Sequence, residues 1–358
     1  MLYIVFLTAR CNLRCTYCGG SIEESVMPPE ITYDIDELVE FISTDPSPSI
    51  AFYGGEPLLR ADLMVKIMDK IEAEHFILQT NGLLLDRVDA EYMKRFSTIL
   101  VSIDGRREVT DHYRGGVYEK VIRNVRWVRK AGYEGELIAR MVATELTDIY
   151  SDVLHLLSIP EFSHVHWQID AVWSPESLWK NFAGWVDRYN SGISRLASYF
   201  LSRLREGEVP GIVPFLGILK AIIFQENMKP PCGSGVDSFA ITTDGRIVAC
   251  PVCADLPWNQ CGDISANRHG GLKRNKVKIL EPCQSCRYSF ACGGRCLFFN
   301  RERLWGHEGF RLVCGTSQHL IQEMMRIAPE IISLSRQGVI DVKMLYYPEY
   351  NNTTEIIP

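Results

Sequence analysis

Short apolar runs alternate with amphipathic stretches over the first 170 residues of the chain. The apolar runs have the length and the β-branched and aromatic content of strands. They lie at 2–8, 50–53, 75–80, 98–103, 136–142 and 164–170. Apolar residues recur at helical spacing between them, in 34–43, 60–73, 87–96, 117–131 and 148–158. Such alternation is typical of βα units around a parallel sheet. It predicts an α/β fold with a partial (β/α)6 TIM-like barrel that is open on one side.

The pattern changes after residue 170, where the stretch 171–230 has helical spacing throughout. Two short β runs then flank Asp244-Gly245, which predicts a hairpin. A last amphipathic helix is expected over 315–337, followed by a polar tail. Together with the cysteine distribution given below, these changes predict three parts. They are a barrel with bridging helices over 1–225, a cysteine-rich domain over 226–320, and a C-terminal helix and tail over 321–358.

Composition places the chain among ordinary globular proteins, with 46% hydrophobic and 23% charged residues. Its net charge of −6 argues against a surface that follows nucleic-acid phosphates. No apolar run approaches the ~20 residues of a membrane span, and the first predicted strand leaves no room for a signal peptide. Twelve cysteines in such a chain indicate a reducing, cytoplasmic location and metal ligation rather than disulfides.

Three of these cysteines, Cys11, Cys15 and Cys18, lie in a C-x3-C-x2-C spacing directly after the first strand. The other nine fall between residues 232 and 314. Cubane iron–sulfur clusters are usually held by four thiolates. Three closely spaced thiols would therefore leave one iron open for a ligand that is not protein. A zinc site is the alternative, although zinc favours two C-x2-C pairs close together.

Polar turns follow the next predicted strands, at the end where βα folds place their chemistry. Gly54-Gly55-Glu56-Pro57 forms a tight turn after the second strand, and its glycines let backbone approach a ligand closely. The third and fourth strands end in Gln79-Thr80-Asn81-Gly82 and Ser102-Ile103-Asp104-Gly105, and Asp111-His112-Tyr113-Arg114-Gly115 follows. We expect these turns to share one rim with the cysteine loop.

Together these motifs resemble the radical S-adenosylmethionine (SAM) superfamily, including the aromatic Tyr17 directly before the third cysteine. The resemblance implies that the open iron chelates SAM, which is cleaved reductively to a 5′-deoxyadenosyl radical. Glu56 would meet the SAM amino group, Ser102 its ribose and Arg123 its carboxylate. A solvated helix face is the alternative for Arg123. The full set of SAM contacts implied is Tyr17, Gly54, Gly55, Glu56, Asn81, Ser102 and Arg123.

The later cysteines resemble the SPASM extension, which is shared by maturases of ribosomal peptides and of sulfatases. The run Cys283-x2-Cys286-x5-Cys292-x3-Cys296, with Cys314 further on, is its most specific part. The resemblance implies two auxiliary [4Fe–4S] clusters and hence three clusters altogether. One would be held by Cys283, Cys286, Cys292 and Cys314, and the other by Cys232, Cys250, Cys253 and Cys296. Cys261 is the alternative to Cys253, which we favour because it forms a compact C-x2-C with Cys250.

The resemblance implies an enzyme that abstracts a hydrogen atom from an unactivated carbon. Sulfatase maturases carry an aspartate base where this chain has Pro251. We therefore expect a ribosomally made peptide as substrate, with a cross-link or another oxidation as the product. The alternatives are a residue of a folded protein, a small molecule, or a redox relay without SAM chemistry.

Acid–base residues and partners are the least determined part of this interpretation. Asp104 and Asp111 are the candidate catalytic residues, and Tyr113, His166 and Asp170 are further candidate acid–base or substrate contacts. A flavodoxin- or ferredoxin-type reductant is expected as a partner. Because the chain starts directly with the first barrel strand, any recognition of a leader peptide is expected from the SPASM surface or from a separate leader-binding protein.

Overall fold

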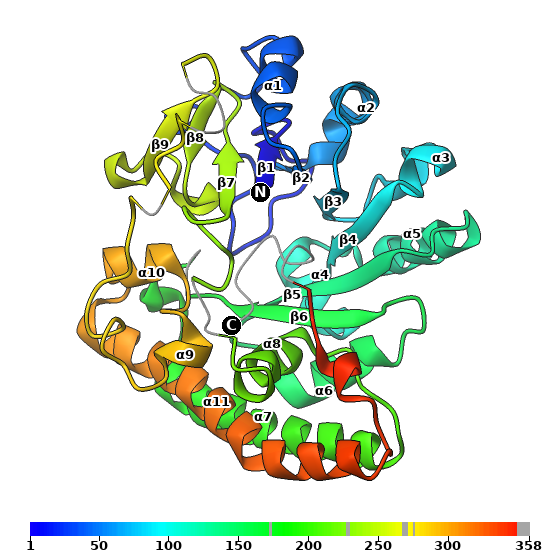
Figure 1. Ribbon diagram of the computed structural model, residues 1–358, viewed down its shortest axis with the longest axis vertical. Helices are drawn as coiled ribbons and strands as arrows, with labels where there is room; N and C mark the ends of the chain where they lie inside the picture. Colours follow the sequence, from blue (N-terminus) through cyan, green and yellow to red (C-terminus); the bar gives the residue numbers. More distant parts are fainter. Residues whose placement is uncertain (172–173, 227–229, 267–270, 275, 349–358) are drawn as a thin grey trace. The chain divides into compact units, whose positions relative to one another are not determined.

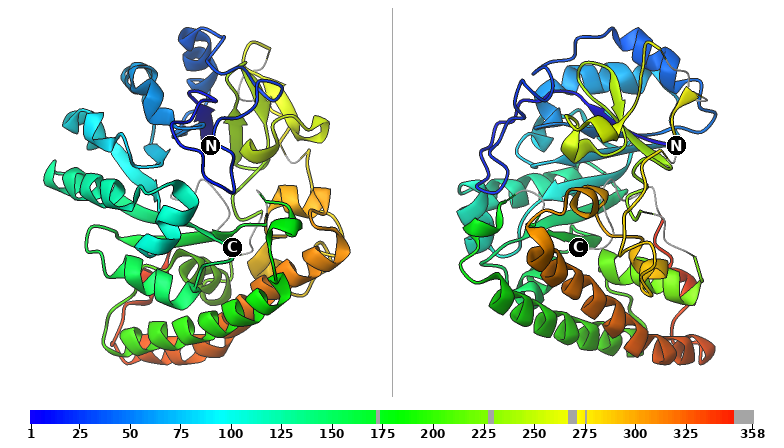
Figure 2. Two further views of the ribbon diagram at one scale, coloured as in Figure 1. Left: turned by 180° about the vertical axis from the view of Figure 1, so that it is seen from behind. Right: turned by 90° about the vertical axis from the view of Figure 1, so that its left-hand side faces the viewer.

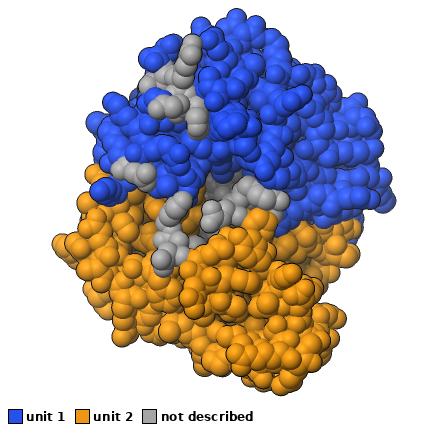
Figure 3. Space-filling model, viewed as in Figure 1, with its two compact units in different colours: residues 1–103, 110–138, 233–278 blue, residues 104–109, 139–232, 279–358 orange. Residues whose placement is uncertain are grey.

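The computed structural model describes residues 1–171, 174–226, 230–266, 271–274 and 276–348. The chain divides into two compact units, which have different colours in Figure 3. The first unit consists of residues 1–103, 110–138 and 233–278, and the second of 104–109, 139–232 and the residues from 279 onward. Residues 233–278 thus group with the N-terminal strands and not with the cysteines that follow them.

The first unit is built on a mostly parallel sheet with β1 (Leu2–Phe6) inside it. β2 (Ser49–Tyr53) and β7 (Ser238–Ile241) flank β1 on its two sides, both parallel to it. β3 (His75–Thr80) and β4 (Phe96–Ser102) continue the parallel order beyond β2. β8 (Arg246–Val248) and β9 (Gln260–Asp263) add antiparallel strands beyond β7, so the predicted hairpin is confirmed.

The strand order confirms an α/β fold with a sheet that does not close into a barrel. β5 (Glu136–Ala143) lies next to β4, begins in the first unit and continues into the second. There it lies next to β6 (His164–Ile169). All six strands predicted for the barrel exist, with ends that shift by at most two residues.

Alternate residues of the first unit's strands form one apolar core. Leu2, Ile4 and Phe6 of β1 face the same side because side chains alternate along a strand. Residues of the neighbouring strands join them: Ala51, Ile77, Leu100, Ile138, Ala240 and Val248. Helices α1 (Ile35–Ile42), α2 (Ala61–Lys70) and α5 (Tyr118–Lys130) lie on the outer side of these strands (Figure 1). Both faces are thus covered, as parallel sheets require.

Two helices differ from the sequence prediction. The helix predicted over 87–96 is reduced to α3 (Ala90–Met93), because Phe96 already belongs to β4 and packs edge-on against Phe52, with ring centroids 6.2 Å apart. A helix that the periodicity missed, α4 (Arg107–Arg114), follows β4. Its sequence is almost entirely polar, so a hydrophobic pattern does not reveal it.

The second unit is largely helical. Its helices are α6 (Ile149–Leu157), α7 (Phe182–Arg205), α8 (Val213–Ile223), α9 (Ser289–Cys292), α10 (Leu297–Glu302) and α11 (Gly306–Arg336). The long helices α7 and α11 run side by side (Figure 2). Ser194 of α7 joins them, since its Oγ lies 2.9 Å from His319 Nε2 and 3.0 Å from Glu323 Oε1. α11 starts nine residues before the predicted 315, because its glycines weaken the helical signal there.

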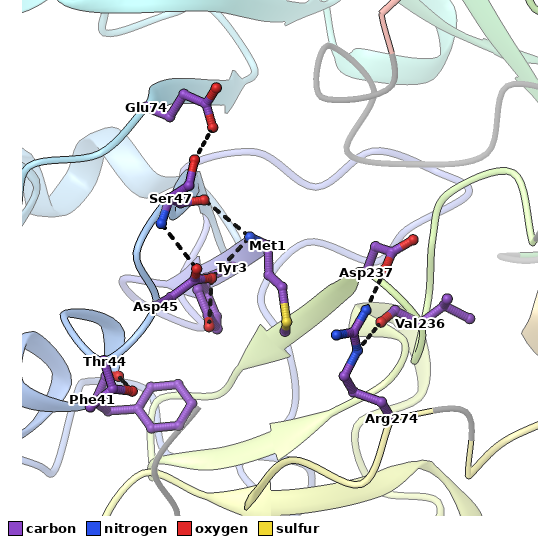
Figure 4. A network of polar contacts seen from close by, with 10 residues as sticks. All are labelled: Met1, Tyr3, Phe41, Thr44, Asp45, Ser47, Glu74, Val236, Asp237 and Arg274. Carbon is purple, nitrogen blue, oxygen red and sulfur yellow. Dashed lines mark hydrogen bonds and ion pairs between the residues drawn. The ribbon is translucent and has the colours of Figure 1, made fainter. Parts of the chain in front are cut away.

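A polar network fixes the start of β1 (Figure 4). The terminal ammonium of Met1 lies 2.9 Å from Asp45 Oδ2, and Tyr3 Oη donates to the same oxygen at 3.1 Å. Ser47 N donates to Asp45 Oδ1. Asp45 thereby connects the first residues of β1 to the segment that leads into β2. The site described next depends on the register of these two strands.

Candidate functional site

The loop that follows β1 carries Cys11, Cys15 and Cys18. Its turn is closed by two backbone hydrogen bonds, since Cys18 N and Gly19 N both donate to Cys15 O, at 3.0 and 2.9 Å. The pKa of the Cys11 thiol is raised to about 11, mainly by burial and also by nearby Glu56, Cys15 and Cys18, although the hydrogen bond from Leu13 N lowers it. The three thiols therefore lie within electrostatic reach of one another. Iron would have to displace their protons, as thiolate ligation always requires.

The Gly54-Gly55-Glu56 turn packs directly against this loop. Gly55 N donates to Thr8 O at 3.0 Å, and Glu56 N donates to Arg10 O at 2.8 Å. A Cβ atom on Gly54 would lie 2.3 Å from Thr8 O, and one on Gly55 would lie 2.3 Å from Arg10 O. No side chain fits at such distances. The glycines are needed for contact between two loops of the protein, in addition to any role toward a ligand.

Glu56 is fully buried and hydrogen-bonded by three groups of the protein. Its Oε1 accepts from Thr80 Oγ1 at 2.7 Å and from Leu58 N at 3.1 Å. Its Oε2 accepts from Asn81 N at 2.7 Å. Burial raises the pKa of Glu56 to about 7, although these three donors act in the opposite direction. In this structure Glu56 connects the turn after β2 to the turn after β3.

Asn81 extends the connection to the cysteine loop. Its Nδ2 donates to Asn12 Oδ1 at 2.7 Å, and Asn12 directly follows Cys11. The loops after β1, β2 and β3 are thus joined by one chain of hydrogen bonds. Sequence analysis singled out Glu56 and Asn81 but missed Asn12 and the hydroxyl of Thr80, because only the fold brings them together.

The remaining predicted SAM contacts have different surroundings. Ser102 is the last residue of β4 and is half-buried. Arg123 lies on the exposed side of α5, where it lines a surface pocket of about 440 Å³ together with Arg126, Trp127 and Lys130. A contact between Arg123 and the SAM carboxylate stays a prediction.

A second arginine lies against the cysteine loop. Arg114 ends α4, is buried, and places its Cζ 5.4 Å from the centroid of the Tyr17 ring. Sequence analysis included Arg114 only as part of a motif and assigned it no role. Asp111, a candidate catalytic residue, uses its Oδ1 to accept from Tyr118 N at 2.8 Å and so joins α4 to α5.

Comparison with known families decides what kind of site this is. Residues 5–157, which contain the cysteine loop and the turns after β2 to β4, match the Radical SAM superfamily. Residues 5–157 therefore form a radical SAM domain.

Relatives of this radical SAM protein differ in how much of the chain they match. The Fe-coproporphyrin III synthase of Methanosarcina barkeri is 30% identical over 45% of this chain, which spans 42% of that protein. The cysteine-type anaerobic sulfatase-maturating enzyme of Clostridium perfringens is 21% identical over 80% of this chain and 85% of its own length. The chain is therefore similar to enzymes of more than one kind.

Solved structures share the fold over a longer stretch. The anaerobic sulfatase-maturating enzyme anSMEcpe, with bound AdoMet and the Cp18Cys peptide, matches with a TM-score of 0.71 and 20% identity, covering 94% of this chain and 99% of that one. SuiB of Streptococcus suis, bound to its precursor peptide SuiA, matches with a TM-score of 0.54 and 13% identity, covering 82% and 71%. At such identities the likeness shows the fold alone.

Four of the later thiols of the radical SAM protein form a group in the second unit. The pKa of Cys292 is raised to about 12, mainly by burial and also by Cys314 and Cys283. The pKa of Cys314 is raised by burial and by Cys286, and that of Cys283 by burial and by Cys314 and Cys286. Cys283, Cys286, Cys292 and Cys314 therefore lie within electrostatic reach of one another. Four thiols of this kind fit a [4Fe–4S] cluster.

Three further thiols, Cys250, Cys253 and Cys261, lie in the first unit and are held by different contacts. Asn259 is buried and holds the turn between Cys250 and Cys253, because its Nδ2 donates to both carbonyls and its Oδ1 accepts from Cys250 N, each at 2.8 Å. Cys261 lies on β9 and is fully buried, with its Sγ 3.6 Å from Asn259 O. Cys232 and Cys296 belong to the second unit. Which thiols hold the remaining cluster stays a prediction.

No group of three or more His, Cys, Asp or Glu side chains is set to hold a single metal ion in the described part of the chain. The thiols of a cubane cluster bind different irons, so they stand further apart than the ligands of one ion. Among the same residues, no helix is long and apolar enough to cross a membrane.

Two carboxyls lie at strand ends in the second unit. Asp104, just after β4, is fully buried, and its Oδ1 accepts from Val142 N at 2.9 Å. Asp170, just after β6, is 5% exposed, and its Oδ1 has no hydrogen-bond partner among the described residues. Burial raises the pKa of Asp170 to about 6, Ser174 hydrogen-bonds to it, and the charge of Asp104 adds to the rise. His166, a further candidate contact from the sequence, is buried on β6.

Proposed function

We propose that this radical SAM protein abstracts a hydrogen atom from a ribosomally made peptide and leaves a cross-link or another oxidative modification. The observation that carries the proposal is the cysteine loop, which hydrogen bonds connect to Glu56 and Asn81. Positioned by neighbouring loops in this way, three thiols suit a cluster with one open iron. The peptides bound by the structural neighbours anSMEcpe and SuiB support a peptide as substrate.

The first unit supplies the residues for SAM in this proposal. Cys11, Cys15 and Cys18 would hold the SAM cluster, which together with SAM supplies a 5′-deoxyadenosyl radical. Glu56 acts by fixing the turn after β2 and by orienting Asn81. The proposed SAM contacts remain Tyr17, Gly54, Gly55, Glu56, Asn81, Ser102 and Arg123.

The second unit supplies the group of four thiols for an auxiliary cluster, and this group supports the SPASM interpretation. A further auxiliary cluster on Cys232, Cys250, Cys253 and Cys296 would raise the number of clusters to three. A flavodoxin- or ferredoxin-type protein is the proposed reductant.

Asp170 is the residue that we assign to substrate binding or deprotonation. It follows β6 directly, at the carboxyl end of a strand, where βα folds place their chemistry. Its backbone is held by two hydrogen bonds, from Asp170 N to Ala143 O at 2.9 Å and from Trp179 Nε1 to Asp170 O at 3.2 Å. A rigid, buried carboxylate with one open oxygen is suited to receive a donor. Asp104 is less suited to this role, because its Oδ1 already accepts a hydrogen bond from Val142 N.

The test uses the anaerobically reconstituted protein with SAM, dithionite and the small-peptide fraction of its host, in deuterated water. Mass spectra of the peptides and the yield of 5′-deoxyadenosine are the readouts. We expect 5′-deoxyadenosine together with a peptide that has lost two hydrogens. Cys15→Ala is the matched control and should give neither product.

Other outcomes would contradict parts of the proposal. If 5′-deoxyadenosine forms and no peptide changes, the substrate is a folded protein or a small molecule. A tetrapyrrole would then be tried first, given the similarity to Fe-coproporphyrin III synthase. Absence of 5′-deoxyadenosine from an iron-loaded protein would contradict the SAM chemistry itself.

A further inference from the structure

The aromatic residue of the cysteine loop is enclosed by the end of α4. Tyr17 is 8% exposed and lies between Cys15 and Cys18 in sequence. The Arg114 guanidinium lies over its ring, with Cζ 5.4 Å from the centroid, and Arg114 is itself 7% exposed. A cation over the face of a tyrosine ring is attracted by the ring quadrupole, and the attraction grows when the pair is desolvated.

Residues next to Arg114 add two contacts to the same part of the loop. Thr16 N donates to Tyr113 O at 3.0 Å, so the loop backbone is hydrogen-bonded to α4. The rings of Tyr113 and Tyr17 pack with centroids 6.0 Å apart, in a tilted arrangement. The outer side of Tyr113 is in turn supported by the His112 ring, edge-on at 4.7 Å.

The end of α4 is itself firmly closed. Gly115 N and Gly116 N both donate to Asp111 O, at 3.0 and 3.1 Å, and both glycines have positive φ. Tyr118 N donates to Asp111 Oδ1 at 2.8 Å. Arg114 therefore projects from a backbone that is fixed on both sides, which makes it a rigid support for Tyr17.

We propose that Arg114 is a positioning residue for the cysteine loop. Its guanidinium, through the Tyr17 ring, fixes the segment between Cys15 and Cys18 and thereby the placement of two of the three thiols that serve SAM cleavage. Arg114 acts through Tyr17 and need not touch SAM or the cluster.

The test is the cleavage of SAM in the absence of any substrate. Reconstituted wild-type protein and Arg114→Gln are compared by their KM and kcat for 5′-deoxyadenosine formation with dithionite, and by the electron paramagnetic resonance spectrum of the reduced SAM cluster. Arg114→Gln should raise KM for SAM about tenfold with a smaller change in kcat, and should broaden that spectrum. Arg114→Lys retains a cation and should recover roughly a third to a half of the loss.

Arg129→Gln is the matched control. Arg129 also lies over a tyrosine, with Cζ 5.3 Å from the Tyr133 ring centroid, and it has no contact with the cysteine loop in the described hydrogen bonds. Its KM and spectrum should equal those of the wild type. A loss of the same size in Arg129→Gln would mean that general destabilisation explains the result, and would overturn the proposal.

A double-mutant cycle decides whether Arg114 acts through Tyr17. Tyr17→Leu removes the ring, and Arg114→Gln in that background should add little further effect. Additive effects, or an Arg114→Gln protein with wild-type KM and spectrum, would overturn the proposal. Circular dichroism checks folding, and Arg114→Lys with Tyr17→Leu completes the test if Arg114→Gln does not fold. No peptide is present, so failure of the peptide hypothesis leaves this result unaffected.

Discussion

Glu56 in the first unit and Asp170 in the second are both buried carboxyls at the ends of parallel strands, and their surroundings are opposite. Glu56 receives three hydrogen bonds, which occupy both of its oxygens. Asp170 is bonded by Ser174, and its Oδ1 has no partner among the described residues. Burial raises the pKa of both carboxyls, to about 7 and about 6.

The difference separates two uses of a buried carboxyl. A carboxylate that protein donors already satisfy holds loops together, and its removal leaves those donors without partners. A carboxylate with an open oxygen costs folding free energy and is retained where a ligand or a proton uses it. The motif that looks most like a ligand contact in the sequence therefore has a structural role as well. The less conspicuous aspartate has the acceptor oxygen that no described residue uses.

The largest expected effect is that of Glu56→Ala. Three buried donors lose their acceptor, which should lower the free energy of unfolding by about 3–5 kcal/mol. The cysteine loop should shift with Asn81 and Asn12, and SAM cleavage should fall by about 100-fold or more. Chemical unfolding and 5′-deoxyadenosine yield measure the two effects. Glu91→Ala, at an exposed position, is the control. Equal free energies of unfolding and equal 5′-deoxyadenosine yields for the two variants would contradict the structural role of Glu56.

The pH dependence of stability should show both carboxyls. Their pKa values are raised in the folded state, so their contribution to stability is present at low pH and is lost as pH rises through about 6 and 7. We expect a loss of about 4 kcal/mol between pH ~5 and ~8, because the pKa of Glu56 lies about two units and that of Asp170 about one unit above pH ~5, at roughly 1.4 kcal/mol per unit. Urea unfolding of the wild type and of Glu56→Gln/Asp170→Asn measures it. Parallel pH profiles for the two proteins would contradict the assignment.

The smallest effect on stability, with the opposite sign, is expected for Asp170→Asn. Removal of a buried charge that lacks a full set of donors should raise the free energy of unfolding by about 1 kcal/mol near pH 8. Peptide modification should fall by roughly 100-fold. Asp104→Asn is the contrasting variant, because Val142 N donates to Asp104 and the loss of that bond should destabilise. A destabilised Asp170→Asn protein with normal activity would mean that Asp170 has a structural role, as Glu56 does.

Sequence analysis found the elements that carry a strong hydrophobic signal. β1 and β3 are apolar runs bounded by polar turns, and the Asp244-Gly245 hairpin follows from its turn residues. α4 was missed, because its residues are nearly all polar and its position depends on tertiary contacts. The cysteine loop and the Gly54-Gly55-Glu56 turn were found by spacing alone, since each lies within one short segment.

The hydrogen-bond partners of the site residues could not be predicted from the sequence. Thr80 and Asn12 meet Glu56 and Asn81 across three different loops, and no local pattern indicates such distances. The role proposed for Arg114 depends on a ring that lies 97 residues earlier in the chain. A signal existed in the motif that contains Arg114, yet motif membership alone does not say which neighbour a side chain touches.

The pairing of β1 with β7 has a consequence for the order in which the protein is made. β1 is made well before β7, so the strand that covers its second edge is completed only at Ile241. During most of synthesis β1 is therefore an edge strand, exposed to pairing with other chains. The cysteine loop continues from β1, so iron delivered to a nascent chain would meet a loop whose strand stays half-covered until β7 is made.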